Sequence, residues 1–182
     1  FYKPPESSAE IKYVKERRAK LAGPVPSRPT HHPVTQVPTL DDYRKLLDQY
    51  SGKTLSTTMG FVRLLQRLCK DKLIGKNVVP IVPDESRTFG MEGMFSEVGI
   101  YAHAGQLYEP VDRKEESATY YKEAKHGQIL EEGINEAGSM ASFNAAGTAY
   151  SCHGVNMIPF YIYYSMFGFQ RIGDLIWAAM DM

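Results

Sequence analysis

Short β-branched segments that alternate with longer helical ones are the feature that most limits how this chain can fold. The run Val78–Val82 is apolar and bounded by Gly75 and Pro83, which predicts a buried strand. Residues 128–131 and 157–164 predict two further short strands. Helices are predicted over residues 8–22, 39–51, 57–71, 135–151 and 166–182. This alternation predicts an α/β fold with a parallel sheet, whose ligand site lies at the carboxyl ends of the strands.

Local signals predict where individual helices begin and which side they bury. Ser7 and Glu10 have the spacing of a capping box before the first helix, and Thr39 and Asp42 have the same spacing before the second. In the third helix the apolar side chains that share one face are Val62, Leu65 and Cys69. Residues 87–127 are rich in Gly, Met and charge without a sustained period, so we expect long active-site or interface loops there, with one short helix near 92–98.

A proline-rich stretch separates the first helix from the remainder of the chain. Residues 23–39 contain prolines at positions 24, 26, 29, 33 and 38. Proline at this density prevents both helix formation and sheet pairing, because it lacks the backbone N–H and fixes φ. We therefore expect a linker between two domains.

Composition excludes several classes of function. Lys+Arg and Asp+Glu balance at 21 each, which removes the electrostatic case for a nucleic acid or an anionic membrane as the main partner. Cys69 and Cys152 are far apart in sequence, which argues against a disulfide scaffold and fits a reducing compartment. The histidines lack metal-ligand spacing, so no metal site is predicted. The longest apolar stretch, 157–164, is too short to span a bilayer, and we expect a soluble protein.

Both ends of the chain have the character of cut ends. The first residue is Phe1 rather than Met, and residues 175–182 form an apolar helical segment without a stop signal. We expect the chain to be an excerpt from a longer polypeptide.

Carboxylates and aromatic rings are predicted where the strands end. Asp84 and Glu85 follow the first strand, Glu136 begins the helix after the second, and the third strand leads into Tyr164 and Phe167. Each residue alone has a simpler interpretation: a strand-end Asp is commonly a loop or cap residue, a Glu in a first helical turn complements the helix dipole, and aromatic stripes are usually core. Together they fit a site at the edge of a parallel sheet.

Four segments resemble the homodimeric type of pyruvate dehydrogenase (acetyl-transferring), a transketolase-like family of thiamine-diphosphate enzymes. They are Asp84–Gly93, Tyr120–Glu123, Gly127–Glu136 and Ile158–Leu175. The resemblance implies that residues 35–182 are a pyrimidine-binding (transketolase-like middle) domain of the parallel-sheet, thiamine-diphosphate-binding fold, incomplete at its carboxyl end. Residues 1–34 would then be the tail of the pyrophosphate-binding domain and the proline-rich linker.

The resemblance also implies roles for the candidate residues. Glu136 would hydrogen-bond the pyrimidine ring nitrogen of thiamine diphosphate, which requires a carboxyl able to hold a proton near neutral pH. We expect an apolar setting that includes Ile134 and Ala137 to favour that state. Phe167 would stack on the aminopyrimidine, because a flat apolar ring binds and orients a flat heterocycle.

Three further residues resemble those around the family's reacting centre. Asp84 would lie toward the cofactor, and Glu85 and Tyr164 toward the substrate and intermediate. The chain departs from the family's pattern at Ser86, where we expect Ala, and at Met180, where we expect Gly.

The activity that this resemblance implies is decarboxylation of pyruvate and transfer of the acetyl group to lipoyl groups of an acetyltransferase core. The cofactors would be thiamine diphosphate and Mg²⁺, with the magnesium ligands outside this segment. The partners would be a second copy of the protein, the dihydrolipoyl acetyltransferase core and pyruvate. The location would be the cytoplasm in bacteria or the mitochondrial matrix in eukaryotes. Two alternatives stay open, namely a sister 2-oxo-acid dehydrogenase with another substrate and a noncatalytic dimerisation module of the same fold.

Overall fold

The computed structural model describes residues 2–21, 23, 34–84, 86–111, 113 and 120–182. Glu85, one of the predicted site residues, lies outside these ranges. Most of the proline-rich stretch also lies outside them, so its role as a linker stays a prediction from the sequence.

Three short parallel strands form the main sheet. Strand β1 (Val78–Val82) lies in the centre, with β4 (Leu130–Glu131) and β5 (Ile158–Tyr161) on either side of it. Val82 pairs with Glu131 and Ile81 with Tyr161, so the three strands end at nearly the same level. This arrangement confirms the predicted parallel α/β sheet and brings the carboxyl ends of all three strands to one edge.

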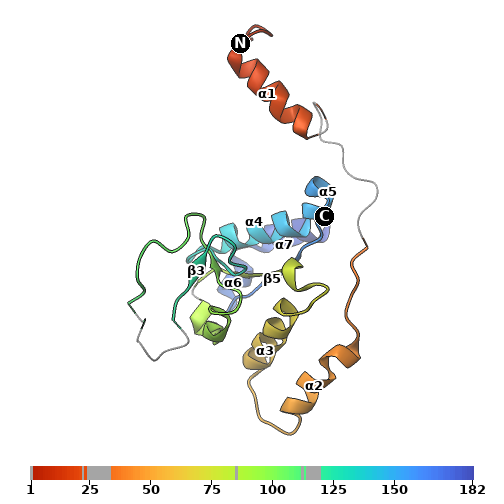
Figure 1. Cartoon of the computed structure of the whole chain (residues 1–182), viewed down its shortest axis with the longest axis vertical. Coiled ribbons are helices and arrows are strands. Elements are labelled where there is room, and N and C mark those ends of the chain that lie inside the picture. Colours follow the sequence, from red (N-terminus) through yellow and green to blue (C-terminus); the bar gives the residue numbers. More distant parts are fainter. Residues whose placement is uncertain (1, 22, 24–33, 85, 112, 114–119) are drawn as a thin grey trace.

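Helices cover both faces of this sheet (Figure 1). On one face α3 (Thr57–Cys69) packs in a common core with Val78 and Val82 of β1, through Val62, Leu65 and Cys69. The predicted buried face of α3 is therefore confirmed. On the other face α4 (Glu136–Gly147) contacts β1 and β5, and α7 (Gly173–Met180) packs on α4. In Figure 1 α4 and α7 lie on one side of β5 and α3 lies on the other.

Side-chain caps fix the first residues of the amino-terminal helices. Helix α2 (Leu40–Tyr50) begins as predicted after Thr39, whose backbone N–H and hydroxyl donate to Asp42 Oδ2 at 2.7 and 2.8 Å. Helix α1 (Ala9–Lys20) begins after Ser8, whose Oγ accepts the backbone N–H of Ile11 at 3.3 Å. The predicted capping box at Ser7 is therefore wrong by one residue, because either serine could cap and the sequence does not distinguish them.

Two helices predicted as continuous are each divided in two. The segment predicted as 135–151 ends its first part at Gly147 and resumes as α5 (Ala149–His153), with Thr148 Oγ1 donating back to the carbonyl of Asn144 at 2.7 Å. A threonine that bonds the preceding turn in this way bends a helix. The segment predicted as 166–182 divides into α6 (Phe167–Gln170) and α7, because Ile172 between them has a non-helical backbone, with φ −128°.

The described part of the segment 87–127, residues 87–111, 113 and 120–127, contains more regular structure than the sequence predicts. Two 3₁₀ turns, η2 (Ser86–Phe89) and η3 (Glu92–Met94), follow β1, and η1 (Gly75–Asn77) precedes it. Two short strands, β2 (Ile100–Tyr101) and β3 (Glu123–Ala124), form a second parallel sheet, which a bridge from Ile100 to Ile129 joins to the β4 segment. Long-range burial orders this region, since its apolar side chains Met91, Met94, Phe95 and Ile100 are almost fully buried. Among the described residues, no helix is long and apolar enough to cross a membrane.

We expect Leu65→Ala to lower the free energy of unfolding of the chain by about 2–5 kcal/mol, because Leu65 is fully buried between α3 and β1. Urea denaturation followed by circular dichroism measures this change. The matched control is Leu64→Ala on the same helix, where the side chain is partly exposed and the expected loss is small. Equal losses for the two variants would contradict the assigned face of α3.

Candidate functional site

A cavity of about 190 Å³ lies where β1 and β5 end and α4 begins. Four of the predicted site residues line it: Asp84, Glu136, Tyr164 and Phe167. They come from three segments that are far apart in the sequence. Its other lining residues are Pro83, Ile134, Tyr163, Ser165, Gly168 and Arg171. The fifth predicted residue, Glu85, lies outside the described residues.

Asp84 and Tyr164 join the ends of β1 and β5 across this cavity. The Tyr164 hydroxyl donates a hydrogen bond to Asp84 Oδ2. This hydrogen bond, with a smaller contribution from desolvation, raises the pKa of Tyr164 above its ordinary value. The phenol therefore stays protonated at neutral pH and acts as a donor. The Phe89 ring packs against the Tyr164 ring with 5.2 Å between centroids.

The turn after Tyr164 places the backbone in an uncommon conformation. Ser165 has φ +69°, the only positive φ at a non-glycine position among the described residues. Such conformations cost of order 1–3 kcal/mol and gather at ligand sites, where the surrounding structure holds them. The turn carries Phe167 into the cavity wall, where the residue remains 56% exposed.

Glu136 stands in the first turn of α4 and pairs with an arginine of the neighbouring segment. Its Oε1 accepts a hydrogen bond from Arg171 Nη1 at 2.7 Å, and its side chain is only 16% exposed. The Arg171 guanidinium also lies over the Phe167 ring, 5.4 Å from its centroid. The predicted contribution of Ile134 and Ala137 to an apolar setting for Glu136 is wrong, because Ile134 is 81% exposed and Ala137 is exposed too. The carboxylate is engaged by Arg171 instead.

Gly168 and Tyr161, which were not predicted as site residues, fix the position of the Phe167 turn. The Tyr161 hydroxyl donates to the carbonyl of Gly168 at 2.8 Å, and burial raises the pKa of Tyr161 to about 12. A Cβ at Gly168 would lie 2.6 Å from Tyr163 Cδ2, so the ring of Tyr163 requires glycine there. The sequence signal for this turn was a glycine, Gly168, that closely follows the aromatic-rich segment 160–164 and adjoins Phe167.

Glu131 is a third carboxylate near the strand ends that the sequence analysis did not select. It ends β4 and accepts hydrogen bonds from the backbone N–H of Ser86 at 2.9 Å, from the Ser86 hydroxyl, and from the Tyr121 hydroxyl at 2.6 Å. Its position at a strand end, like that of Asp84, was the signal that could have identified it.

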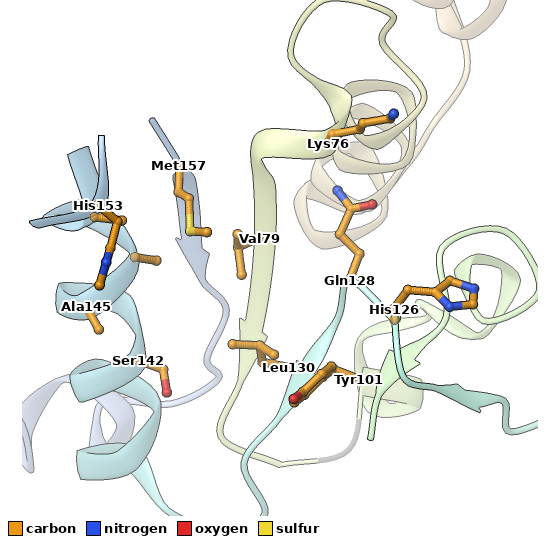
Figure 2. A pocket seen from close by; sticks show the side chains of 13 residues that line it. Lys76, Val79, Tyr101, His126, Gln128, Leu130, Ser142, Ala145, His153 and Met157 are labelled. Carbon is orange, nitrogen blue, oxygen red and sulfur yellow. The ribbon is translucent and has the colours of Figure 1, made fainter. Parts of the chain in front are cut away.

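A larger cavity of about 740 Å³ lies between α4 and the β4 edge, toward the amino ends of the strands (Figure 2). Val79, Leu130 and Met157 form its apolar wall, with Lys76, His126 and His153 around it. It includes none of the predicted site residues. Ligands of parallel sheets bind at the carboxyl ends of the strands, so the smaller cavity is the better candidate site. Within the described residues, no group of three acidic, histidine or cysteine side chains is placed to hold a metal ion.

Comparison with known proteins identifies the family. Residues 35–182 match the family model described as pyruvate dehydrogenase E1 component middle domain. The chain is 59% identical over 181 residues to the pyruvate dehydrogenase E1 component of Pseudomonas aeruginosa, covering 100% of this chain and 20% of that protein. It is 54% identical to the protein of that name from Escherichia coli (97% and 20% covered) and 52% identical to that from Corynebacterium glutamicum (100% and 19% covered). The chain thus spans about a fifth of the length of these relatives, and it belongs to the pyruvate dehydrogenase E1 component family, with the middle domain in residues 35–182.

Proposed function

We propose that the protein to which this chain belongs decarboxylates pyruvate and transfers the acetyl group to lipoyl groups of a dihydrolipoyl acetyltransferase, and that this chain supplies the pyrimidine side of its cofactor site. The single observation that carries the proposal is the cavity that gathers Asp84, Glu136, Tyr164 and Phe167 from three segments. The relatives named pyruvate dehydrogenase E1 component support the reaction.

The side chains around the cavity fit the aminopyrimidine of thiamine diphosphate. The shielded carboxyl of Glu136 can share a proton with a ring nitrogen, and the partly exposed Phe167 ring is complementary to a flat heterocycle. When bound, thiamine diphosphate supplies an electron sink for decarboxylation of a 2-oxo acid. We assign the Mg²⁺ ligands and the diphosphate contacts to other parts of the protein, as the family resemblance implies.

Glu136 is the residue that we assign to the pyrimidine ring nitrogen. The carboxylate is shielded from water, which strengthens a hydrogen bond made there. In this chain Oε1 is engaged by Arg171, so a ligand at the carboxylate competes with that ion pair or shares the carboxylate with it. Phe167 would bind and orient the ring beside it.

Asp84, Glu85 and Tyr164 are the residues that we assign to the reacting centre. The Tyr164 hydroxyl is protonated at neutral pH, because its pKa is raised, and its single proton is donated to Asp84 Oδ2. To stabilise negative charge that develops on a substrate oxygen, Tyr164 would donate this proton to that oxygen in place of Asp84. The assignment of Glu85 rests on the sequence alone.

We also propose that the protein is a homodimer and that a second copy covers this face. Apolar side chains beside the cavity are largely exposed in the single chain: Ile134, Met166, Phe167 and Phe169. Exposed apolar clusters of this kind mark interaction surfaces. Residues 1–34 would be the end of the preceding, pyrophosphate-binding domain and the linker. The named relatives are bacterial, which supports a bacterial cytoplasm as the location.

The experiment that tests this function is reductive acetylation of a lipoyl domain by the full-length protein with thiamine diphosphate and Mg²⁺. Pyruvate should be the best substrate among 2-oxo acids of increasing chain length. A preference for a longer acid would indicate a sister dehydrogenase, and absence of turnover with every acid would indicate a noncatalytic dimerisation module.

We expect Glu136→Gln in the full-length protein to lower kcat by about 10²–10⁴, because Gln keeps the shape of the side chain but cannot exchange a proton with the pyrimidine nitrogen. Proton exchange at the thiazolium carbon of bound cofactor, followed by NMR after mixing with D₂O, should slow in parallel. The matched control is Asp174→Asn, an acidic residue in the first turn of α7 that does not line the cavity. If exchange keeps the parent rate while turnover falls, Glu136 serves another step.

We expect Phe167→Ala in the full-length protein to weaken cofactor binding by about 1–3 kcal/mol, by analogy with stacking of bases on aromatic side chains. Tyr164→Phe removes only a hydroxyl that is bonded to Asp84, so it should lower turnover and leave cofactor affinity nearly unchanged. Isothermal titration calorimetry measures both affinities. Equal affinities in the two variants would show that Phe167 is not the stacking ring.

We expect the chain of 182 residues alone to bind thiamine diphosphate weakly or not at all, because the diphosphate and Mg²⁺ contacts lie elsewhere in the protein under this proposal. Calorimetric titration with and without Mg²⁺ measures this binding. Tight, magnesium-dependent binding by the isolated chain would contradict the division of the site.

A further inference from the structure

The Glu131 carboxylate ties together three segments of the chain. It stands at the end of β4, and its Oε1 accepts from the backbone N–H and the hydroxyl of Ser86, just after β1. Its Oε2 accepts from the hydroxyl of Tyr121, which precedes β3. Hydrogen bonds to a charged acceptor are stronger than those between neutral groups, so this carboxylate holds the Ser86 and Tyr121 segments firmly against the end of β4.

The Ser86 end of this network is fully buried. Ser86 is one of two polar residues in the described chain that are buried, and both its backbone N–H and its hydroxyl point to Glu131. A buried donor that loses its acceptor is strongly unfavourable, so removal of the carboxylate would force the backbone at Ser86 to move.

The Tyr121 end of the network is also fixed by packing. Its ring meets the buried Phe95 ring edge-on, with 5.6 Å between centroids. Burial, and then the hydrogen bond to Glu131, raises the pKa of Tyr121, so its hydroxyl remains a donor. The carboxylate is thus held from a second direction by a rigid aromatic side chain.

The η2 turn, which begins at Ser86, is connected to both residues of the Asp84–Tyr164 hydrogen bond. Asp84 lies two residues before Ser86, and Phe89, at the other end of η2, packs on the Tyr164 ring. The turn is closed internally, since the N–H of Met91 donates to the carbonyl of Ser86 at 3.2 Å and that of Gly90 to Arg87 at 2.9 Å. A shift of Ser86 would therefore move Asp84 and Tyr164 together relative to β4 and α4.

We infer that Glu131 is a positioning residue, which holds the η2 turn through Ser86 so that Asp84 and Tyr164 face the cavity in their working geometry. Glu131 is absent from the cavity lining, so it acts through these residues and does not contact the ligand. The inference rests on the proposed function, because it concerns the reacting-centre side of that site and leaves the Glu136–Phe167 side untouched.

The test uses the full-length protein with thiamine diphosphate and Mg²⁺. Glu131→Met keeps the length of the side chain and removes both acceptor oxygens, whereas Glu131→Gln retains one acceptor for the Ser86 N–H. Misplacement of reacting groups by about 1 Å can cost about 10²-fold, so Glu131→Met should lower kcat/KM for pyruvate by about that factor. Because Asp84 lies toward the cofactor under the proposed function, cofactor affinity should fall much less than kcat/KM, and Glu131→Gln should recover most of the lost turnover. The matched control is Glu132→Met, because that carboxylate bonds Ser142 of α4 rather than the η2 turn.

A fall in kcat/KM that is much larger than any loss of cofactor affinity, and that Glu131→Gln restores, supports the inference. Unchanged turnover in Glu131→Met overturns it, as does a parallel loss of turnover, cofactor affinity and melting temperature, which would show a purely structural role. If Glu131→Met fails to fold, the double variant Ser86→Ala with Tyr121→Phe tests the inference. It removes the hydrogen bonds from the Ser86 and Tyr121 hydroxyls to Glu131, and it keeps the carboxylate and its bond to the Ser86 backbone N–H. Unchanged kcat/KM in that variant overturns the inference.

A readout independent of turnover separates this inference from the proposed function. With fluorotyrosine placed at position 164, the ¹⁹F resonance reports the Asp84–Tyr164 pair directly. The resonance should shift in Glu131→Met and return toward the parent position in Glu131→Gln. An unchanged resonance defeats the inference whatever the enzyme does with pyruvate, while a parent protein inactive on every 2-oxo acid defeats only the proposed function.

Discussion

The parallel pairing of β1 with β4 and β5 is the constraint on which the remaining structure depends. It places Asp84, Glu131 and Tyr164 at one edge of the sheet, although any two of them are separated by about a fifth to almost half of the chain. A slip of one residue would turn every side chain of a strand to the opposite face. Burial of Val78 and Val82 against α3 prevents such a slip, so the core specifies the register and the register specifies the site.

Two carboxylates near the turn between β4 and α4 have different surroundings and, in this account, different tasks. Glu131 is satisfied by donors from Ser86 and Tyr121 and has no part in the cavity wall. Glu136 faces the cavity and is paired with Arg171, whose guanidinium also lies over Phe167. In our proposal Glu131 therefore holds the η2 turn in place, whereas Glu136 can exchange its partner Arg171 for a ligand. The exposed rings beside Glu136, those of Phe167 and Phe169, belong to the face that we propose a second copy covers.

The elements with strong local signals could be predicted from sequence, and those ordered by distant contacts could not. The β-branched run Val78–Val82 and the apolar face of α3 confirm the predictions residue by residue. The second sheet and the η2 turn were missed, because Met94, Phe95 and Ile100 are ordered by burial against other segments rather than by local propensity. Among the site residues, Asp84 and Glu136 could be predicted because they are acidic and stand just after predicted strands. Arg171 could not be chosen in this way, because its role comes from a partner 35 residues away. Glu131 shares the strand-end position, but its hydrogen bonds to Ser86 and Tyr121 appear only in the structure.

The most direct test of the central claim is a crystal structure of the full-length protein with thiamine diphosphate and Mg²⁺ bound. This account predicts that the aminopyrimidine lies in the cavity lined by Asp84, Glu136, Tyr164 and Phe167, with its ring nitrogen at the Glu136 carboxylate and its face on the Phe167 ring. A pyrimidine ring that lies elsewhere, for example in the larger cavity beside Val79 and Met157, or one that leaves Glu136 paired with Arg171 alone, would contradict it.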